Sequence, residues 1–480
     1  MSDTTTPDDL TVARPVPGSF RDPAGVVYTR DGLLLRQVDR SFAETYDAVV
    51  ASGLYDALHQ RGLLVRHDEV PAEEQDALAL DPARAHRVLR PERVPFVSYP
   101  YEWSPGMRRA AALATLDAMS VALDHGMVLR DASAFNVVFL RGRAVLIDTL
   151  SFGPREPDAP WAAYHQFCRH FLAPLALECT VDVRLGALTR TDVAGVPLDL
   201  AATMLPASTK LRPALLTHLH LQARAQRDRE VAVDGAGGER RTVRFSDTAM
   251  RGLVEQLRGA VAKLTWEPAG TTWADYYETA AHYSDEAMAS KVAGVGAFLD
   301  AVAPTTVWDL GANTGRFALL AAERGAHVVA ADIDHGAVER GWRARTGADW
   351  PDVPGDVHPL LLDLGNPSPA LGWALTERPS IVDRGPADAV LALALVHHLA
   401  IAGEVPLPRV VDLLASLGRD VLVEWVPKDD PKVRVLLATR EDRFDGYTTE
   451  DFLAACASRG EVVSTTPVAG TDRLLVHLRP

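Results

Sequence analysis

One continuous segment constrains the fold of this chain more than any other. It spans residues 305–334 and reads TTVWDLGANTGRFALLAAERGAHVVAADID. An apolar strand carries Asp309 near its end, a turn with Gly311 and Gly315 follows, and a helix leads to a second apolar strand that ends near Asp332. In open α/β sheets, ligands bind beyond the carboxyl ends of the strands, where glycine allows close approach to the backbone. The segment therefore predicts a ligand-binding βαβ unit in which Asp332 accepts hydrogen bonds from a ribose.

The spacing of the glycines narrows the choice of ligand. Gly311-x-x-x-Gly315 is neither the G-x-G-x-x-G of dinucleotide-binding folds nor the G-x-x-x-x-G-K-[ST] of P-loops. Asp363 closes a third predicted strand, in LLLDLGNPSP, within reach of a base. The alternative is that the glycines form an ordinary tight turn and that the acids only cap strands.

Apolar strands alternate with helices of about ten residues from about Thr271 onward. This alternation predicts a parallel sheet covered on both faces. The last two strands, EVVSTTPV and RLLVHLR, are separated only by residues 469–472, too few for a crossover helix. We therefore expect them to pair antiparallel, as a hairpin at the sheet edge.

The run DLGANTG at 309–315, together with Asp332 and Asp363, resembles the nucleoside-binding motifs of class I S-adenosylmethionine-dependent methyltransferases. The resemblance covers roughly residues 271–480. It implies an α/β fold with a Rossmann-like seven-stranded sheet whose last strand is antiparallel, and S-adenosyl-L-methionine as the cofactor. The cofactor-binding residues that it implies are Asp309 near the amino group, Gly311, Asn313 and Gly315 along the methionine part, Asp332 at the ribose and Asp363 near the adenine amine.

The acceptor end of such a site lies beyond the fourth strand, predicted here as ADAVLALALVHHLAI at 387–401. His397 and His398 end this segment, and either is a candidate general base. Neighbouring residues on a strand point to opposite sides, so we expect only one histidine to face the site. Glu424 and Trp425 end the fifth strand and are predicted to contact the acceptor and to wall the pocket. The alternative for all four is structural hydrogen bonding, strand capping or packing.

An aromatic group precedes the first strand of this half. Tyr276, Tyr277 and Tyr283, with Lys291, are predicted either to cover the cofactor as a lid helix or to join the core.

A second constellation lies in the amino-terminal half, in VLRDASAFNVVFLRGRAVLIDTLSF. Asp131 and Asn136 are separated by four residues, and Asp148 comes twelve residues after Asn136. In kinases an Asp accepts the proton of the attacking hydroxyl, while an Asn and a second Asp hold magnesium against the nucleotide phosphates. The segment resembles these loops in protein-kinase-like folds, particularly small-molecule phosphotransferases of the aminoglycoside or choline kinase type, which implies an α+β amino-terminal domain.

This second pattern departs from a working kinase. The chain contains no lysine before Lys210, so Arg36 is the obvious substitute for the phosphate-binding lysine, and the two residue types are not interchangeable there. Asp148 is followed by Thr-Leu instead of Phe-Gly, and no glycine-rich loop precedes it. These departures favour a degenerate kinase-like domain that binds a substrate or partner. An active kinase and a coincidental Asx-rich turn remain the alternatives.

Composition excludes several classes of protein. The 480 residues carry a net charge of −15, which disfavours a nucleic-acid partner. Three cysteines are too few for a disulfide framework or a four-cysteine zinc site, and we expect no metal in the carboxyl-terminal site. The sequence shows no secretory signal and no membrane-spanning run, so we expect a cytoplasmic protein. We make no prediction of oligomeric state.

Taken together, these features predict a methyltransferase acting on oxygen or nitrogen of a small-molecule acceptor, assisted by the amino-terminal domain. The alternatives are a bifunctional small-molecule kinase and methyltransferase, which would also use Mg-ATP, and a non-catalytic cofactor-binding module. The shared runs SYPYEWS, LRDASAFN, IDTLSF, DLGANTG and LALALVHHLA resemble a bacterial group of such methyltransferases, some of them nodulation-related. The predicted parts are a disordered tail at 1–20, a kinase-like domain at 21–232, a linker and helix at 233–270 and a methyltransferase domain at 271–480.

Overall fold

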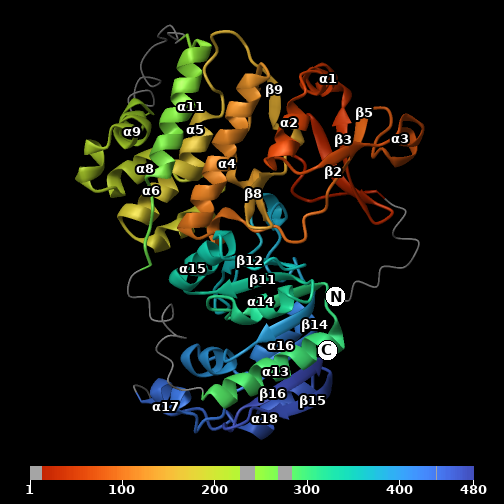
Figure 1. Ribbon diagram of the computed structural model, residues 1–480, viewed down its shortest axis with the longest axis vertical. Helices are drawn as coiled ribbons and strands as arrows, with labels where there is room; N and C mark the ends of the chain where they lie inside the picture. Colours follow the sequence, from red (N-terminus) through yellow and green to blue (C-terminus); the bar gives the residue numbers. More distant parts are fainter. Residues whose placement is uncertain (1–12, 227–243, 269–283, 439–440) are drawn as a thin grey trace. The chain divides into compact units, whose positions relative to one another are not determined.

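The computed structural model divides the chain into two compact units, and each is described here by itself (Figure 1). The first unit comprises 1–139, 143–266 and 371–378, and the second comprises 140–142, 267–370 and 379–480. The structure describes residues 13–226, 244–268, 284–438 and 441–480. Most of the predicted tail, the glycine-rich part of the predicted linker and the three tyrosines of the predicted lid lie outside the described residues.

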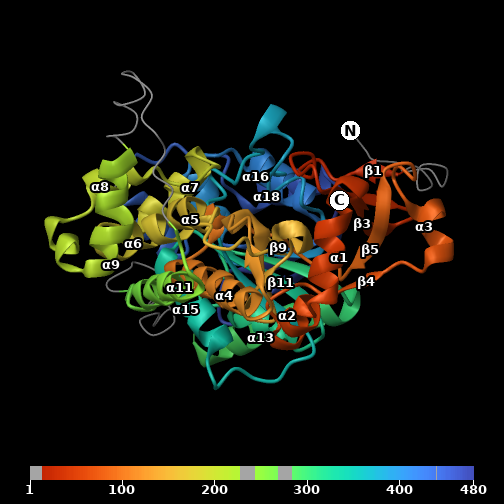
Figure 2. The ribbon, with the colours of Figure 1, turned by 90° about the horizontal axis from the view of Figure 1, so that it is seen from above.

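The first unit begins with a five-stranded antiparallel sheet in the order β1-β2-β3-β5-β4. Its strands are β1 (Arg14–Pro15), β2 (Gly25–Arg30), β3 (Leu33–Asp39), β4 (His67–Glu69) and β5 (Ala85–Pro91). Asp31 and Gly32 both have positive φ, 53° and 74°, as a two-residue hairpin turn between β2 and β3 requires. Tyr28, Leu35 and Val88 form the apolar core of this sheet. Figure 2 shows β3 and β5 side by side.

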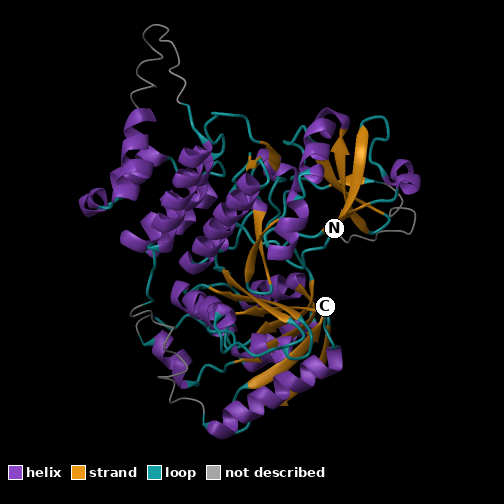
Figure 3. Ribbon diagram, turned by 45° about the horizontal axis from the view of Figure 1, so that its top comes forward, coloured by secondary structure: helices purple, strands orange, loops and turns teal. Residues whose placement is uncertain are grey.

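Helices dominate the rest of the first unit, and Figure 3 shows most of them away from the five strands. The α-helices are α1 (Ala43–Ala51), α2 (Leu54–Arg61), α3 (Ala72–Leu78), α4 (Pro105–Asp124), α5 (Tyr164–Phe167), α6 (Ala173–Thr180), α7 (Leu188–Thr191), α8 (Leu198–Met204), α9 (Pro213–Leu215) and α11 (Asp247–Ala262). Four short strands form two pairs. Strand β6 (Met127–Leu129) pairs antiparallel with β9 (Phe152–Pro154), and β7 (Val137–Leu140) pairs with β8 (Arg143–Leu146). The second pair is joined by a turn at Arg141 and Gly142, which both have positive φ, 49° and 71°.

Helix α11 lies within the region 233–270, where a linker and helix are predicted, and it packs on α4. Arg251 and Arg258 of α11 form ion pairs of 2.7 and 2.8 Å with Asp124 and Asp117 of α4. Its apolar face is buried, with Leu257 fully inaccessible. The described helix of the predicted linker region is therefore part of the first unit and not a free connector.

The second unit contains a seven-stranded sheet in the order β12-β11-β10-β13-β14-β16-β15. Its strands are β10 (Thr306–Leu310), β11 (His327–Asp332), β12 (Asp356–Leu361), β13 (Ala387–Ala392), β14 (Gly418–Trp425), β15 (Glu461–Pro467) and β16 (Leu474–Arg479). The first five strands in this order are parallel, and β16 runs antiparallel to both β14 and β15. The predicted parallel sheet and its antiparallel terminal hairpin are confirmed, with β15 as the edge strand.

Helices cover this sheet. They are α13 (Asp285–Val302), α14 (Arg316–Ala322), α15 (His335–Thr346), α16 (Leu407–Leu417), α17 (Pro431–Leu437) and α18 (Thr449–Ala457). Phe298 and Leu299 of α13 and Phe317 of α14 pack with Val307 and Leu391 of the strands in one apolar core. This core holds the carboxyl ends of β10, β11 and β13 in fixed register. Among the described residues, no helix is long and apolar enough to cross a bilayer.

Candidate active site

The turn between β10 and α14 takes a conformation that its glycines make possible. Gly311 and Gly315 have φ values of 78° and 90°, in the left-handed region that residues with a Cβ adopt only at a cost. Asn313, between them, is also left-handed, with φ of 52°. The backbone of DLGANTG therefore doubles back at the carboxyl edge of the sheet, as the sequence predicts.

Asp309 lies at the base of this turn and is buried, with 1% of its surface exposed. Its Oδ2 atom has no hydrogen-bond partner among the residues that the structure describes. Burial raises the pKa of Asp309 to about 7, while the nearby Lys291 ammonium lowers it and the Asp332 carboxylate raises it. A buried carboxyl oxygen without a donor is costly, so this atom is a ready acceptor for a ligand donor.

Asp332 connects the turn to the end of β11. Its Oδ2 accepts the Asn313 backbone N–H at 2.7 Å, and its Oδ1 accepts the N–H of Asp334 at 2.9 Å. Burial raises its pKa, and these two N–H donors lower it. A carboxylate has about four lone-pair sites, so two backbone bonds leave Asp332 with acceptor capacity for hydroxyl groups.

Ile333 is a candidate site residue that the sequence reasoning missed. It directly follows Asp332, and 56% of its surface is exposed although it is a large apolar residue. The sequence signal that could have identified Ile333 is its place between two acids, Asp332 and Asp334, at the end of a strand. An exposed apolar side chain beside an acid at the edge of the sheet suits the face of a flat base.

Asp363 lies two residues beyond the end of β12. The Leu362 N–H donates to the carbonyl of Asp332 at 2.8 Å, which brings this segment to the same edge of the sheet as β11. Asp363 is exposed, and its Oδ1 accepts the Gly365 N–H at 2.8 Å in a local turn. Its predicted place near the adenine amine stays a prediction.

The strand predicted to run through His397 and His398 is shorter than expected and does not include the two histidines. β13 ends at Ala392, and Ala394 has a left-handed φ of 52°, which reverses the chain before the histidines. His397 and His398 instead lie at the start of a short helix, with ring centroids 4.2 Å apart. The expectation that the two rings point to opposite sides therefore fails, because it assumed extended backbone.

His397 is the more buried of the two, with 2% of its surface exposed. Its Nδ1 has no hydrogen-bond partner within the described ranges. Burial lowers the pKa of His397 well below its ordinary value, and the charges of His398, Arg473 and Lys291 act in the same direction. Burial also lowers the pKa of His398. Both imidazoles are therefore neutral near pH 7.

Glu424, at the end of β14, belongs to a buried ion-pair network. Its carboxylate contacts Lys291 Nζ at 2.6 Å and Arg473 Nη1 at 3.1 Å, and it has no exposed surface. Arg473 also pairs with Asp430 at 2.8 Å. The Lys291 ammonium lies 4.9 Å from the ring centre of Phe317. The sequence reasoning singled out Glu424 and Lys291 but missed Arg473, which approaches from the distant β16 hairpin.

The prediction that Trp425 walls a pocket is wrong. Trp425 is fully buried, and its ring stacks on Tyr447 and Phe452 with centroids 4.4 and 4.6 Å away. Its Nε1–H donates to Thr449 Oγ1 at 3.0 Å. The side chain anchors α18 against the sheet, because Trp425 alternates with Glu424 along the strand and points to the other face.

In the first unit, the structure brings together part of the Asp131, Asn136 and Asp148 constellation. Ile147 N–H donates to the Asn136 carbonyl at 2.9 Å, which sets the Asn136 loop beside the end of β8. The Nδ2 of Asn136 is buried and has no partner in the described part of the chain. Asp131 accepts the Ser133 N–H at 2.9 Å, as in an Asx turn.

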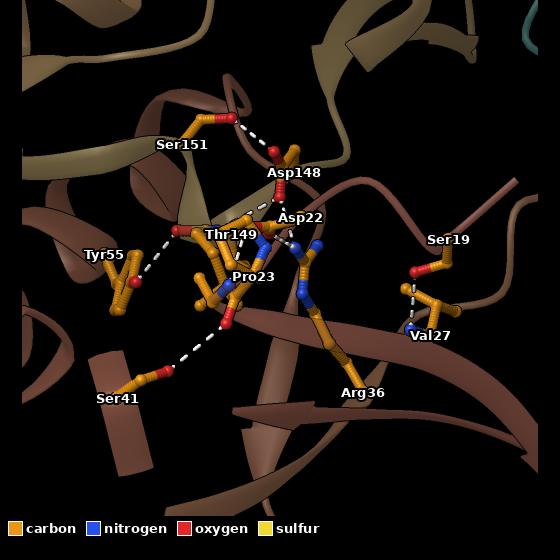
Figure 4. Close-up of polar contacts among 12 residues, drawn as sticks. Ser19, Asp22, Pro23, Val27, Arg36, Ser41, Tyr55, Asp148, Thr149 and Ser151 are labelled. Atoms are coloured by element: carbon orange, nitrogen blue, oxygen red, sulfur yellow. Dashed lines mark hydrogen bonds and ion pairs between the residues drawn. The ribbon is translucent and has the colours of Figure 1, made fainter. Parts of the chain in front are cut away.

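Asp148 is bound to Arg36, as Figure 4 shows. Arg36 Nη2 lies 2.6 Å from Asp148 Oδ1 and 3.2 Å from Asp22 Oδ2. Asp148 also accepts the Leu150 N–H at 3.2 Å and the Ser151 hydroxyl. The candidate magnesium-binding carboxylate is thus already paired with a cation, and this geometry gives no support to Mg-ATP.

Comparison with known proteins identifies the family. No family model matches the chain. Nodulation protein NoeA of Rhizobium meliloti (strain 1021) is 33% identical over 461 residues, which cover 96% of this chain and 95% of that protein. The chain belongs to the NoeA family. The similarity extends over both units and confirms the resemblance to nodulation proteins.

Several solved methyltransferases are similar to part of the chain at low scores. Magnesium protoporphyrin IX methyltransferase from Synechocystis PCC 6803, with bound S-adenosylmethionine, is 18% identical, covering 44% of this chain and 86% of that one, with a TM-score of 0.29. The bifunctional kinase-methyltransferase WbdD is 17% identical, with 45% and 44% coverage and a TM-score of 0.29. The N-methyltransferase NodS from Bradyrhizobium japonicum WM9 is 11% identical, with 41% and 97% coverage and a TM-score of 0.30. TM-scores this low do not establish a function for this NoeA-family chain, so its function is inferred from its own residues.

Proposed function

We propose that the second unit is an S-adenosylmethionine-dependent methyltransferase for oxygen or nitrogen of a small molecule, and that the first unit assists substrate binding. The observation that carries the proposal is Asp309 Oδ2, a buried oxygen with no partner among the described residues. It lies under a left-handed glycine turn, beside a second acid that can bind a ribose.

The residues present suit each part of this cofactor. Asp309 supplies an acceptor for the ammonium group of the methionine part, and ionised Asp309 would be neutralised by it. Asp332 keeps lone pairs for the two ribose hydroxyls while the Asn313 and Asp334 N–H groups hold its orientation. Ile333 offers an apolar surface to the adenine.

The chemistry divides between the cofactor and the protein. The bound sulfonium supplies an electrophilic methyl group. The chain must hold the acceptor atom in line, exclude water and remove a proton where the acceptor is a hydroxyl or an amine. His397 is the best candidate for the base, since its lowered pKa leaves it neutral and its Nδ1 atom lacks a partner within the described residues.

For Glu424 we replace the predicted catalytic role by a positioning role. A carboxylate held by both Lys291 and Arg473 is fixed in place. We assign Glu424 a positioning role, in which its network anchors Lys291 beside Asp309 and Arg473 near His397. His398 stays an alternative base because its ring lies against that of His397.

Calorimetric titration with S-adenosylmethionine tests the cofactor assignment. Asp332→Ala removes charge-assisted hydrogen bonds to the ribose, each worth about 1.5–3 kcal/mol, so Kd should rise by roughly 10- to 100-fold. Asp349→Ala, an exposed acid on the same unit, is the matched control and should bind like the parent protein. Equal affinity of Asp332→Ala and the parent would contradict the proposal.

Mass spectrometry of a small-molecule extract incubated with the protein and isotope-labelled cofactor tests the activity. A labelled product that disappears with Asp332→Ala supports methyl transfer. Tight cofactor binding with no labelled product from any extract fraction would favour the non-catalytic binding module.

A further inference from the structure

Arg36 is paired with Asp148, the carboxylate that a kinase-like site would use to hold its metal. It lies on β3, in the middle of the five-stranded sheet, with 8% of its surface exposed. Its guanidinium reaches across to Asp148, which follows β8 and is far away in the sequence. Figure 4 shows Asp148 and Asp22 converging on the same end of the Arg36 side chain.

Arg36 bridges two carboxylates, those of Asp148 and Asp22. One nitrogen, Nη2, serves both carboxylates, at 2.6 Å from Asp148 and 3.2 Å from Asp22. An arginine that only stabilises an ion pair commonly forms two parallel bonds to one carboxylate. Here Nε of Arg36 is buried and has no partner in the described residues. A single positive centre is thus shared by two acids from separate segments.

The surroundings of Asp148 explain why a metal ion would compete directly with Arg36. The Leu150 N–H and the Ser151 hydroxyl already occupy lone pairs on the two carboxylate oxygens. Magnesium and manganese bind carboxylate oxygens at about 2.0–2.2 Å, in the same place as the guanidinium. Two cations this close repel each other, and arginine does not lose its charge at any physiological pH.

Asp22, the second carboxylate in contact with Arg36, also depends on the positive charge of Arg36. Burial and the Asp148 charge raise the pKa of Asp22, and the Arg36 charge lowers it. Its carboxylate is also tied to the Ala24 N–H at 2.9 Å. The two acids therefore need a counter-ion between them. No group of three or more His, Cys, Asp or Glu in the described part of the chain is placed to hold a metal.

We infer that Arg36 is a built-in counter-ion that takes the place of a divalent cation at Asp148, so that this site binds no divalent metal. This inference concerns the first unit alone and does not depend on methyl transfer. It makes Arg36 the residue that determines the cation specificity of this site.

Manganese titration of the full chain tests this inference, with free Mn²⁺ measured by electron paramagnetic resonance. The parent protein should show no Mn²⁺ site that Asp148→Asn removes. Arg36→Gln should gain one site, with Kd at least tenfold lower than any binding by the parent. Arg36→Gln combined with Asp148→Asn should lose that site, which distinguishes it from adventitious binding elsewhere.

Two matched controls accompany the titration. Arg36→Lys keeps a positive charge and should gain no site. Asp22→Asn leaves the Arg36–Asp148 pair in place and should also gain none. Circular dichroism and a thermal melt establish that each variant is folded. Where Arg36→Gln is not folded, Arg36→Met, which preserves the packing of the aliphatic stem, takes its place.

Two results would overturn the inference. One is an Mn²⁺ site in the parent protein that Asp148→Asn abolishes, because Arg36 would then not exclude the metal. The other is a folded Arg36→Gln or Arg36→Met variant without a new site, because Arg36 would then be no more than a structural ion-pair partner.

Discussion

At the scale of single residues, the charge of Asp309 should control cofactor binding. An ionised carboxylate accepts hydrogen bonds from an ammonium group, whereas a protonated acid does so poorly. Because the pKa of Asp309 is about 7 without ligand, affinity for S-adenosylmethionine should increase as the pH rises from 6 to 8. Calorimetry across this range measures the effect. Asp309→Asn should bind more weakly and with little pH dependence, and an unchanged pH profile in that variant would contradict the assignment.

The same group makes a prediction about stability. The pKa of Asp309 is raised in the folded protein, from an ordinary 3.8 to about 7. Its contribution to stability is therefore fully present below pH 3.8 and is lost as the pH rises toward 7. Without cofactor, the parent should lose stability relative to Asp309→Asn over this interval. Denaturant unfolding of both proteins at pH 5 and pH 8 measures the difference, and equal changes would refute the raised pKa.

Glu424 offers a third prediction at this scale. Glu424→Gln leaves Lys291 and Arg473 buried without their shared carboxylate. Breaking a buried pair in this way costs roughly 3–5 kcal/mol in free energy of unfolding. Urea unfolding followed by fluorescence measures the loss. Asp429→Asn removes an exposed ion pair with Arg434 and is the control, which should change stability little.

At the scale of elements, two glycine substitutions can distinguish a role of the turn after β10 in cofactor binding from a purely conformational role. Gly315→Ala places a Cβ on a residue with φ of 90°, which costs about 1–2 kcal/mol. Gly325 has φ of 91° with no atom near the position of an added Cβ, so Gly325→Ala imposes a similar backbone cost away from the site. Both variants should lose similar stability, but only Gly315→Ala should bind the cofactor more weakly. Equal cofactor affinity in the two variants would show that the turn does not contact the ligand.

Elements also show where pattern reading succeeds. The β2–β3 hairpin and the β15–β16 hairpin follow from turn residues and short connections that lie within the paired segments themselves. The apolar residues between 42 and 58 keep helical spacing, yet this segment forms two helices, because Gly53 takes a left-handed conformation between α1 and α2. Helical spacing of apolar residues continues across such a break, so periodicity alone does not reveal it.

At the scale of the whole molecule, the two units have separate cores. Leu257 of α11 is buried in the first unit, and its replacement by alanine should cost about 2–5 kcal/mol in that unit. The residues proposed to bind the cofactor belong to the second unit, so affinity for S-adenosylmethionine should stay unchanged at a temperature where both units are folded. Scanning calorimetry and titration calorimetry on the full chain measure the two quantities. A parallel loss of cofactor affinity would show that the units do not behave independently.

The sequence by itself determined the order of strands and helices in the second half, the glycine turn with its two acids and the antiparallel terminal hairpin. These features follow from residues close together in the chain, whose periodicity, turn chemistry and connection lengths act locally. Only the tertiary structure decided which side chains meet. Glu424 lies between Lys291 and Arg473, and Asp148 is paired with Arg36, because distant segments bring those charges into the same buried place. Burial then sets the charge state of each group, and no local pattern records either the partner or the burial.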